Sequence, residues 1–371
     1  MKRIFAAILS VVLLGSTAFA ETNGLPPSVS AASAILVDAE SGRVLYEKDV
    51  NTRRLIASTT KLMTALVAVE SLDDLSGEVT IEPEDTQAEG SSLYLKVGEK
   101  LTTETLLYGL LLNSGNDAAL ALARYCAGDV ETFVGWMNQK ALSLGMTNTH
   151  FENPNGLNND AHYSTASDMA ILGIACMENR TVAKIVATRS ITLGTRTFVN
   201  HNKLLSQYKG CVGMKTGYTQ AAGRTLVSAA RQGEQLLICV TLNDPDDWKD
   251  HAALFDYGFE TFPRQILSRR DKPFRILPVS GSLVPMVGVS TSADVYYPLS
   301  GEDRVRAEVQ LPASVAAPVE KRETAGMLSF FLGGKKIGET PLVYAATVHR
   351  DKIDRISPLD RLLSLLSRGT V

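Results

Sequence analysis

The chain has 371 residues, of which 45% are hydrophobic and 21% are charged, and its formal net charge at pH 7 is −3. This length allows two domains with substantial cores, and the composition is that of a globular protein rather than a disordered one. The sequence contains no basic stripe with interleaved aromatic residues, so we expect no nucleic-acid partner.

Residues 1–20 have the pattern of a secretory signal peptide. Lys2 and Arg3 precede an apolar stretch from Ile4 to Gly15, and Ala18-Phe19-Ala20 forms a small-residue cleavage site. The apolar stretch is shorter than the roughly 20 residues that span a bilayer, which disfavours the alternative of an uncleaved anchor. We therefore expect an exported, extracytoplasmic protein.

Residues 21–270 are predicted to form one domain that mixes strands with helices. Residues 34–48 predict a hairpin that turns at Glu40-Ser41-Gly42. Helices are predicted at Ser58–Ser71, Thr103–Leu112, Asn116–Ala127, Ser164–Met177 and Asp250–Phe259. Strands are predicted at Val212–Tyr218, Arg224–Arg231 and Gln235–Leu242. Strands on both sides of a helical block favour the α/β (α+β) class, with an antiparallel sheet flanked by helices and a helical subdomain.

The C-terminal part of the chain has a different pattern. From about Lys272, strand-like runs alternate with Pro, Gly and Ser, with a hairpin predicted at Leu328–Thr340, so residues 271–350 predict a separate small β-rich domain. Within 351–371, the stretch SPLDRLLSLLSR predicts a helix capped by Ser357, and its leucines fall within one arc of about 160°. Such a helix either packs on its own domain or lies peripherally at a membrane surface, and both alternatives stay open.

The cysteines and histidines do not form a recognisable catalytic or metal-binding pattern. Three of the four cysteines lie in apolar surroundings, so we expect free thiols rather than two disulfides; the four are Cys126, Cys176, Cys211 and Cys239. No C-x-x-C or H-E-x-x-H spacing occurs, and no metal or other cofactor is expected. We expect structural hydrogen bonds from the scattered histidines, which are His150, His162, His201, His251 and His349.

Ser58 and Lys61 form a Ser-x-x-Lys pair at the start of a predicted apolar helix. Residues three apart share one helix face, with Cβ atoms about 5–6 Å apart, so the Lys61 amine can reach the Ser58 hydroxyl. A serine needs a base to accept its proton, and lysine can be that base only when its pKa is lowered. A helix start also favours developing negative charge. The spacing alone is a weak signal, because Ser206 and Lys209 repeat it in a loop-like stretch.

Two triplets supply the missing context. Ser114-Gly115-Asn116 interrupts a predicted helical hairpin, so its side chains can point into a cleft. Lys215-Thr216-Gly217 lies on a predicted strand, where alternate residues face one side, and Gly217 would let a substrate approach the backbone. Either triplet alone fits a helix-breaking turn or a solvated strand end. Together with Ser58 and Lys61 they predict a serine acyltransferase site, in which Lys215 would disfavour the charge of Lys61.

In this order, Ser58-x-x-Lys61, Ser114-x-Asn116 and Lys215-Thr216-Gly217 resemble the motifs of the penicillin-recognising serine acyltransferases. Flanking stretches such as GLLLNSGNDAALALA are similar to the D-alanyl-D-alanine carboxypeptidases among the low-molecular-weight penicillin-binding proteins. The resemblance covers residues 30–260, and more loosely the C-terminal β domain and terminal helix. It implies a β-lactamase/transpeptidase-like fold and removal of the terminal D-alanine of the peptidoglycan stem peptide through an acyl-enzyme. It also implies covalent binding of β-lactams.

The resemblance assigns a role to each motif residue. The catalytic residues are Ser58 (acylated nucleophile), Lys61 (its proton acceptor), Ser114 (proton relay to the leaving amine) and Asn116 (binding of the substrate amide). The substrate-binding residues are Lys215 and Thr216 (terminal carboxylate), Gly217, and Tyr218, whose backbone N–H forms the oxyanion hole with that of Ser58.

One segment departs from the family pattern. Several members place an arginine after the third sheet strand, near the substrate carboxylate, but here Leu242–His251 has Lys249 as its only cation. Either Lys249 serves instead, or Lys215 and Thr216 suffice, or the substrate preference differs.

Two alternative functions compete with the carboxypeptidase. A serine β-lactamase is disfavoured because no convincing Glu-x-x-x-Asn loop lies between Asn116 and Lys215, and because of the additional C-terminal segments. A catalytically silent wall-binding protein is disfavoured because Ser58, Lys61 and Lys215 are intact.

Overall fold

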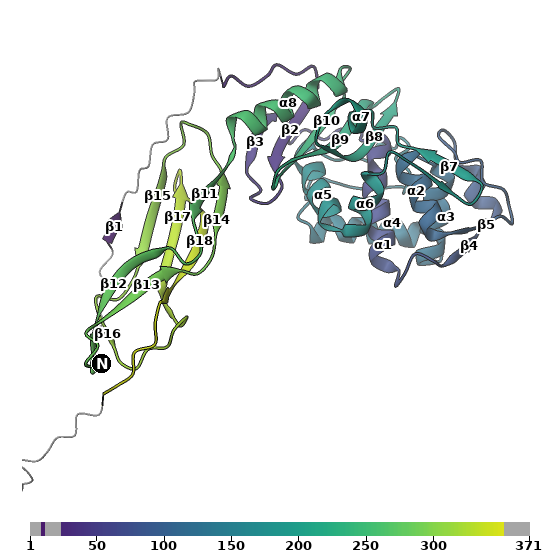
Figure 1. Cartoon of the computed structure of the whole chain (residues 1–371). Helices are drawn as coiled ribbons and strands as arrows, with labels where there is room; N and C mark the ends of the chain where they lie inside the picture. The colour runs from purple at the N-terminus through teal and green to yellow at the C-terminus, as the bar shows by residue number, and fades with distance from the viewer. Residues whose placement is uncertain (1–8, 12–23, 352–371) are drawn as a thin grey trace, which may run out of the picture. The chain divides into compact units, whose positions relative to one another are not determined.

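The computed structural model describes residues 9–11 and 24–351 (Figure 1). Within these residues the chain forms two compact units. The larger contains residues 24–263 and 298–300, and the smaller contains residues 9–11, 264–297 and 301–351. Each unit is described by itself.

A five-stranded antiparallel sheet lies at the centre of the larger unit (Figure 1). Its strands are β2 (Ser33–Asp38), β3 (Val44–Lys48), β8 (Cys211–Thr219), β9 (Gly223–Gln232) and β10 (Gln235–Leu242). Their spatial order is β3-β2-β10-β9-β8, and all neighbours are antiparallel. Strand β8, which carries Lys215, is therefore an edge strand of the sheet.

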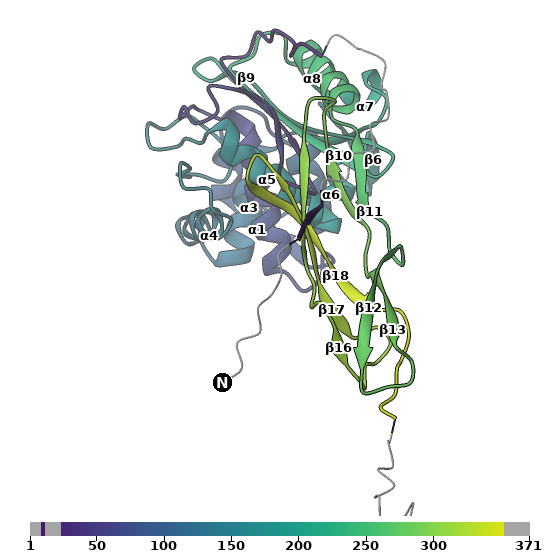
Figure 2. The same cartoon turned by 90° about the vertical axis from the view of Figure 1, so that its left-hand side faces the viewer.

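Helices cover both faces of this sheet, as Figures 1 and 2 show for α5 (Ala166–Glu178) and α8 (Asp247–Thr261). Successive side chains of a strand point to opposite faces. On β10, Leu237 lies in one hydrophobic cluster with Phe255 of α8, whereas Ile238 lies in the other with Leu172 of α5. Both faces of the central strands are thus buried, which explains their almost continuous apolar sequence.

The remaining helical elements of the larger unit are the 3-10 helices η1 (Ala57–Thr60) and η2 (Pro83–Gln87) and the helices α1 (Lys61–Ser71), α2 (Thr103–Leu112), α3 (Asn116–Ala127), α4 (Val130–Ser143), α6 (Arg180–Val186) and α7 (Leu204–Gln207). Helix α1 is central among them, because its Leu62, Met63 and Leu66 are buried and α2, α3, α4 and α6 pack against it, whereas η2 packs on α3 and α7 on β8. Two small hairpins accompany them, formed by β4 (Glu78–Thr80) with β5 (Lys100–Thr102) and by β6 (Ser190–Leu193) with β7 (Arg196–Val199).

The predicted fold class is confirmed, and the differences concern single elements. Helices α2 and α3 have the predicted bounds, whereas α8 begins at Asp247 rather than Asp250. The helix predicted from Ser58 begins at Lys61, because residues 57–60 form a 3-10 turn that starts with Ala57 at a φ of 46°. Helices α4 and α6 and the β6–β7 hairpin were not predicted.

The smaller unit is built on a seven-stranded sheet of order β1-β15-β17-β18-β13-β12-β16. Its strands are β1 (Leu9–Val11), β12 (Pro273–Ser280), β13 (Met286–Thr291), β15 (Val305–Gln310), β16 (Val315–Ala316), β17 (Thr324–Leu332) and β18 (Lys335–Tyr344). A short pair, β11 (Arg264–Ser268) and β14 (Val295–Pro298), accompanies the sheet. The predicted hairpin at Leu328–Thr340 is confirmed, although its two strands are longer than predicted.

Three further expectations concern the ends of the chain and the thiols. Apart from Leu9–Val11, residues 1–20 lie outside the described residues, and so does the helix expected at Ser357–Arg368. In the part of the chain that is described, no helix combines the length and the apolar character needed to cross a membrane. All four cysteines are free, as predicted.

Candidate active site

Ser58 lies in the 3-10 turn η1, and neighbouring segments hold this turn in place. The Thr225 hydroxyl of β9 donates a hydrogen bond to the Ile56 carbonyl at 3.1 Å. Behind the turn, Gly156 packs so closely that a Cβ atom there would lie 2.0 Å from the Ala57 carbonyl oxygen. The left-handed conformation of Ala57 is unusual for a residue with a side chain. This conformation is therefore maintained by tertiary contacts, and it sets the direction of the Ser58 side chain.

Lys61 is completely buried and makes three hydrogen bonds at the start of α1. Its Nζ donates to Ser58 Oγ at 2.9 Å, to Asn116 Oδ1 at 2.7 Å and to the Asn155 carbonyl at 2.6 Å. The three acceptors occupy all three positions that an ammonium can use. The amine is thus held beside the Ser58 hydroxyl, as the sequence predicted, although Asn155 was not among the predicted residues.

Burial is the main cause that lowers the pKa of Lys61 well below its usual value of 10.5. The charge of Lys215 lowers this pKa further, while that of Asp117 raises it. The predicted influence of Lys215 is confirmed, but it is secondary to desolvation. Burial also lowers the pKa of Lys215 itself to about 7. At a given pH, each of these two lysines is therefore neutral more often than a lysine in water. The neutral amine is the form in which Lys61 can accept a proton.

Ser114 and Asn116 lie where the α2–α3 hairpin is interrupted. Ser114 has a φ of 62° and separates the two helices, and its side chain lines the same pocket as Ser58. Asn116 begins α3 and is almost completely buried. Its side-chain amide donates to the Glu89 carbonyl while its Oδ1 accepts from Lys61, so the orientation of this amide is fixed at both ends.

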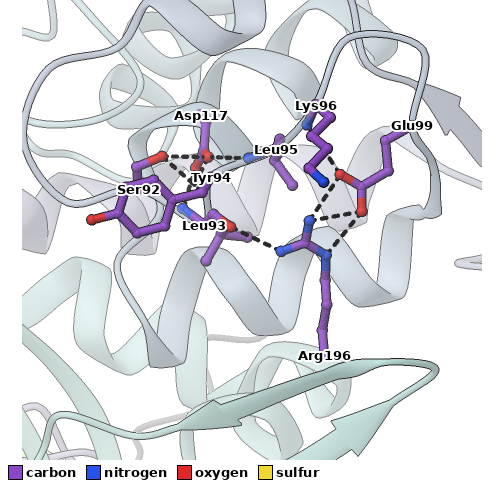
Figure 3. Close-up of polar contacts among 8 residues, drawn as sticks. All are labelled: Ser92, Leu93, Tyr94, Leu95, Lys96, Glu99, Asp117 and Arg196. Carbon is purple, nitrogen blue, oxygen red and sulfur yellow. Dashed lines mark hydrogen bonds and ion pairs between the residues drawn. The ribbon is translucent and has the colours of Figure 1, made fainter.

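The loop that precedes β5 is held against this hairpin by the Asp117 carboxylate (Figure 3). The buried carboxylate accepts the backbone N–H groups of Leu93 at 2.9 Å and Leu95 at 3.2 Å, and the Ser92 hydroxyl at 2.6 Å. Arg196 donates to the Leu93 carbonyl at 2.8 Å and forms an ion pair with Glu99. This network fixes the loop beside Ser91, which lines the pocket.

The four predicted residues of β8 lie on the other side of Ser58. Lys215 is 1% exposed, and its Nζ donates to the Thr216 carbonyl at 2.8 Å. Gly217 faces the turn of Ser58 rather than open space, because a Cβ atom at 217 would lie 2.9 Å from the Ser58 nitrogen. The glycine is thus required for close packing of strand against turn, which is a different reason from the substrate approach that the sequence suggested. Tyr218 is largely exposed.

The predicted residues meet at a pocket of about 320 Å³. It is lined by Ser58, Ser114, Thr216, Gly217 and Tyr218, with Lys61, Asn116 and Lys215 buried behind them. The second Ser-x-x-Lys pair is elsewhere, since Ser206 donates to the Lys203 carbonyl and Lys209 lines a different cavity. Of the two Ser-x-x-Lys pairs, the structure therefore brings only Ser58 and Lys61 together with the two triplets.

Several residues of the pocket were not predicted as functional. They are Ser91, His201, Lys203, Arg224, Asp247 and Trp248. Lys249, which was considered as a replacement for the family arginine, is exposed and does not line this pocket. From the sequence, Arg224 was predicted only to lie on a strand. The one sequence feature that pointed to its place at the pocket is the aspartate-rich segment that contains Asp247.

The histidines mostly make the structural hydrogen bonds that were expected. His162 Nε2 bonds with the Thr60 hydroxyl at 2.8 Å, and its Nδ1 accepts the N–H of Glu152. The buried ring of His251 bonds with Ser228 and Thr241. His201 differs, because it lines the pocket. In the described parts of the chain, no three His, Cys, Asp or Glu side chains gather in a way that could hold a metal ion.

Comparisons with known proteins agree with this geometry. Residues 20–246 match the D-alanyl-D-alanine carboxypeptidase family, and residues 264–350 match the C-terminal domain of penicillin-binding protein 5. The chain is 32% identical to the D-alanyl-D-alanine carboxypeptidase DacF of Bacillus subtilis over 92% of its own length and 93% of that protein. It is 40% identical to DacB2 of Mycobacterium tuberculosis over 64% and 85% of the two chains.

A solved structure gives the same result. Penicillin-binding protein 5 from Haemophilus influenzae is similar with a TM-score of 0.71 and 28% identity, over 88% of this chain and 99% of that one. The family acts on D-alanyl-D-alanine peptides in peptidoglycan metabolism and binds penicillin. The chain therefore belongs to the D-alanyl-D-alanine carboxypeptidases of the serine peptidase type, in the group that carries the C-terminal domain of penicillin-binding protein 5.

Proposed function

We propose that Ser58 is the nucleophile of this carboxypeptidase and that Lys61 is its general base. The observation that carries the proposal is the distance of 2.9 Å between Lys61 Nζ and Ser58 Oγ, with the amine completely buried. A buried amine with a lowered pKa is neutral more often than a lysine in water, and in that form it can accept the serine proton. The Lys61 amine is already oriented toward Ser58 before the reaction, because hydrogen bonds to Asn116 and to the Asn155 carbonyl hold it in place.

In the acylation step, Ser58 Oγ attacks the carbonyl carbon between the last two D-alanines while Lys61 takes the hydroxyl proton. The negative charge that develops on the carbonyl oxygen is stabilised by the backbone N–H groups of Ser58 and Tyr218. Ser114, which lines the pocket, donates its hydroxyl proton to the leaving amine and takes in exchange the proton that Lys61 accepted, so that Lys61 is neutral again. The C–N bond then breaks, free D-alanine leaves, and the shortened peptide remains as an ester on Ser58.

In the deacylation step, a water molecule attacks this ester. Lys61 again accepts the proton and returns it to Ser58 Oγ, so that the enzyme is regenerated and the peptide leaves with a new carboxylate. A β-lactam is attacked in the same way at its ring carbonyl. Its leaving amine stays tethered to the acyl group, and the covalent adduct therefore persists.

The substrate that fits this site is a peptidoglycan pentapeptide with a D-Ala-D-Ala end. Asn116 is placed to bind the amide of the penultimate residue, and its own amide is fixed by the Glu89 carbonyl. The terminal carboxylate is received beside Thr216, which lines the pocket, with Lys215 buried behind it. Gly217 keeps β8 against the turn of Ser58.

The chain itself offers a matched control for the nucleophile. Ser58→Ala should abolish release of D-alanine from an acylated L-Lys-D-Ala-D-Ala peptide and should prevent labelling by a fluorescent penicillin. Ser206→Ala removes the serine of the second Ser-x-x-Lys pair, whose hydroxyl only donates to the Lys203 carbonyl, and should leave both unchanged. Undiminished release of D-alanine by Ser58→Ala would refute the proposal.

We further propose that the protein works outside the cytoplasm, peripherally on the outer face of the cytoplasmic membrane. The support is the signal-peptide pattern of residues 1–20 and the leucine-rich amphipathic pattern of residues 357–368. A chain that ends at residue 356 should shift from the membrane fraction to the soluble fraction and keep its carboxypeptidase activity. Identical fractionation of the two chains would contradict membrane association, and an unprocessed precursor in the cytoplasm would contradict export.

A further inference from the structure

Arg224 extends from β9 into the pocket that contains Ser58. The β8–β9 register pairs Tyr218 with Arg224 and Thr216 with Leu226. Side chains alternate along a strand, so Thr216 and Arg224 lie on the same face of the sheet as diagonal neighbours, about 7–8 Å apart at their Cα atoms. An arginine side chain spans such a distance. The guanidinium and the Thr216 hydroxyl can therefore act on one ligand group.

Two residues of α8 hold the guanidinium in place. Its Nη2 donates to Asp247 Oδ1 at 2.8 Å, and its carbon lies 5.3 Å from the centre of the Trp248 ring. Asp247 is almost buried, with 3% of its side chain exposed, whereas 40% of the Arg224 side chain is exposed. Among the described residues, Asp247 is the only hydrogen-bond acceptor of this guanidinium, which has five N–H donors. Asp247 and Trp248 thus orient the Arg224 guanidinium, which retains N–H donors for a ligand.

The other cations near the pocket are less suited to bind an anion there. Lys215 is buried, and its Nζ already donates to the Thr216 carbonyl. Lys249 is exposed and does not line the pocket. Lys203 lines the pocket but is exposed, and no hydrogen bond of its amine fixes it among the described residues. Arg224 is the cation that combines access to the pocket with a defined orientation.

We propose that Arg224 binds the free α-carboxylate of the last substrate residue and thereby restricts the enzyme to chain ends. The segment that follows β10, Leu242–His251, contains no arginine, and Arg224 supplies a guanidinium from β9. A guanidinium matches a carboxylate with two parallel N–H donors. A peptide whose last carboxylate is amidated or extended by another residue cannot make this contact. Arg224 therefore favours exopeptidase over endopeptidase cleavage.

The test separates carboxylate recognition from a general effect on the site. An acylated L-Lys-D-Ala-D-Ala peptide and its C-terminal amide are each assayed with the full-length wild type, Arg224→Ala and Arg224→Lys. For Arg224→Ala we expect kcat/KM on the acid to fall about 10- to 100-fold, the range for a hydrogen bond to a charged group. On the amide we expect a change within about threefold. Arg224→Lys should be intermediate, because an ammonium keeps the charge but not the two parallel donors.

Two further variants serve as controls. Lys249→Ala, on the same helix as Trp248, should keep the wild-type ratio of acid to amide. Lys203→Ala tests the competing cation of the pocket and should also keep this ratio. Correct folding of every variant is checked by circular dichroism and by the fraction of molecules that a fluorescent penicillin labels at saturation.

Two results would overturn the proposal. An equal loss on acid and amide in Arg224→Ala would show a structural role alone, and a loss of the ratio in Lys203→Ala but not in Arg224→Ala would assign the carboxylate to Lys203. If the amide is cleaved too slowly to measure, the dissociation constants of the two peptides are compared in the Ser58→Ala background, with and without Arg224→Ala. The proposal then requires that Arg224→Ala weakens binding of the acid alone.

Discussion

Gly217 packs against the nucleophile turn so closely that a Cβ atom at position 217 would lie 2.9 Å from the backbone nitrogen of Ser58. The same atom would lie 2.4 Å from the Thr225 hydroxyl oxygen, which anchors the turn by donating to the Ile56 carbonyl. The glycine of β8, the anchor on β9 and the nucleophile thus form one packed unit. A methyl group at position 217 has no space unless the strand or the turn moves.

Gly217→Ala should therefore reduce catalysis more than stability. A shift of Ser58 by a fraction of an ångström alters its alignment with Lys61, and small misplacements of reacting groups can cost about 100-fold in rate. We expect acylation by a labelled penicillin to slow by a factor of that order. Gly135→Ala is the control, because a Cβ atom at this position of α4 would meet nothing within 4 Å, and the change should raise stability by about 0.5–1 kcal/mol. Acylation at the wild-type rate in Gly217→Ala would contradict the packing argument.

Asp117→Asn should destabilise the protein and loosen the loop before β5. The carboxylate accepts bonds from the Leu93 and Leu95 backbone and from the Ser92 hydroxyl, and an amide cannot accept all of them equally well. Hydrogen bonds to buried charged groups contribute about 1.5–3 kcal/mol each. We expect the free energy of unfolding in urea to fall by about 2–4 kcal/mol.

A surface ion pair provides the comparison for Asp117. Glu78 and Lys100 form a pair in which each side chain is more than half exposed, at 58% and 61%. Glu78→Gln should change the free energy of unfolding by less than about 1 kcal/mol. Equal effects of Glu78→Gln and Asp117→Asn would show that the buried carboxylate has no special importance.

Lys215→Met should move the pH dependence of acylation to higher pH. Lys61 accepts a proton only when it is neutral, so the rate rises with pH through the pKa of Lys61. The charge of Lys215 helps to lower this pKa, and its removal raises the pKa and reduces the neutral fraction at a given pH. The measurement is the acylation rate at saturating penicillin between pH 5 and 9. Lys209→Met, an exposed lysine outside the pocket, should leave the curve in place, and a shift to lower pH in Lys215→Met would disprove the coupling.

His162 should make the protein less stable in acid. Burial lowers the pKa of His162 from 6.5 to about 4, so between these values the unfolded chain binds one more proton than the folded chain. Its contribution to stability is therefore complete above pH 6.5 and is lost as the pH falls toward 4, by about 3 kcal/mol in total. Urea unfolding of His162→Gln should show a flatter decline over this range than wild type, and parallel curves would contradict the assignment.

Local sequence patterns predicted the elements that have a broad apolar face or whose ends are marked by helix-breaking residues. The bounds of α2 and α3 follow from the apolar runs on either side of Ser114-Gly115. Helix α4 escaped prediction because only Phe133, Met137 and Ala141 are buried along its length, which leaves a narrow apolar stripe. The 3-10 turn at Ser58 depends on the Thr225 and Gly156 contacts, and no local pattern could indicate them.

The candidate site was predictable where chemistry depends on short spacing. Ser58 and Lys61 meet because they are one helical turn apart, and the two triplets distinguish them from Ser206 and Lys209. Asn155 and Arg224 could not be predicted in the same way. Asn155 contributes a backbone carbonyl, which every residue has, and Arg224 reaches the pocket only through the register of β8 on β9.

Residues that are distant in sequence hold the nucleophile turn in place. Ile56 is bonded to Thr225, 169 positions away, Thr60 to His162, 102 positions away, and Lys61 to Asn155, 94 positions away. Loops of this length close late in folding, because their entropy must be overcome before the contact stabilises anything. The folding chain therefore acquires the geometry around Ser58 only after β9, the last of these segments, has joined the sheet. Covalent labelling by a penicillin would count completed molecules and ignore every partly folded one.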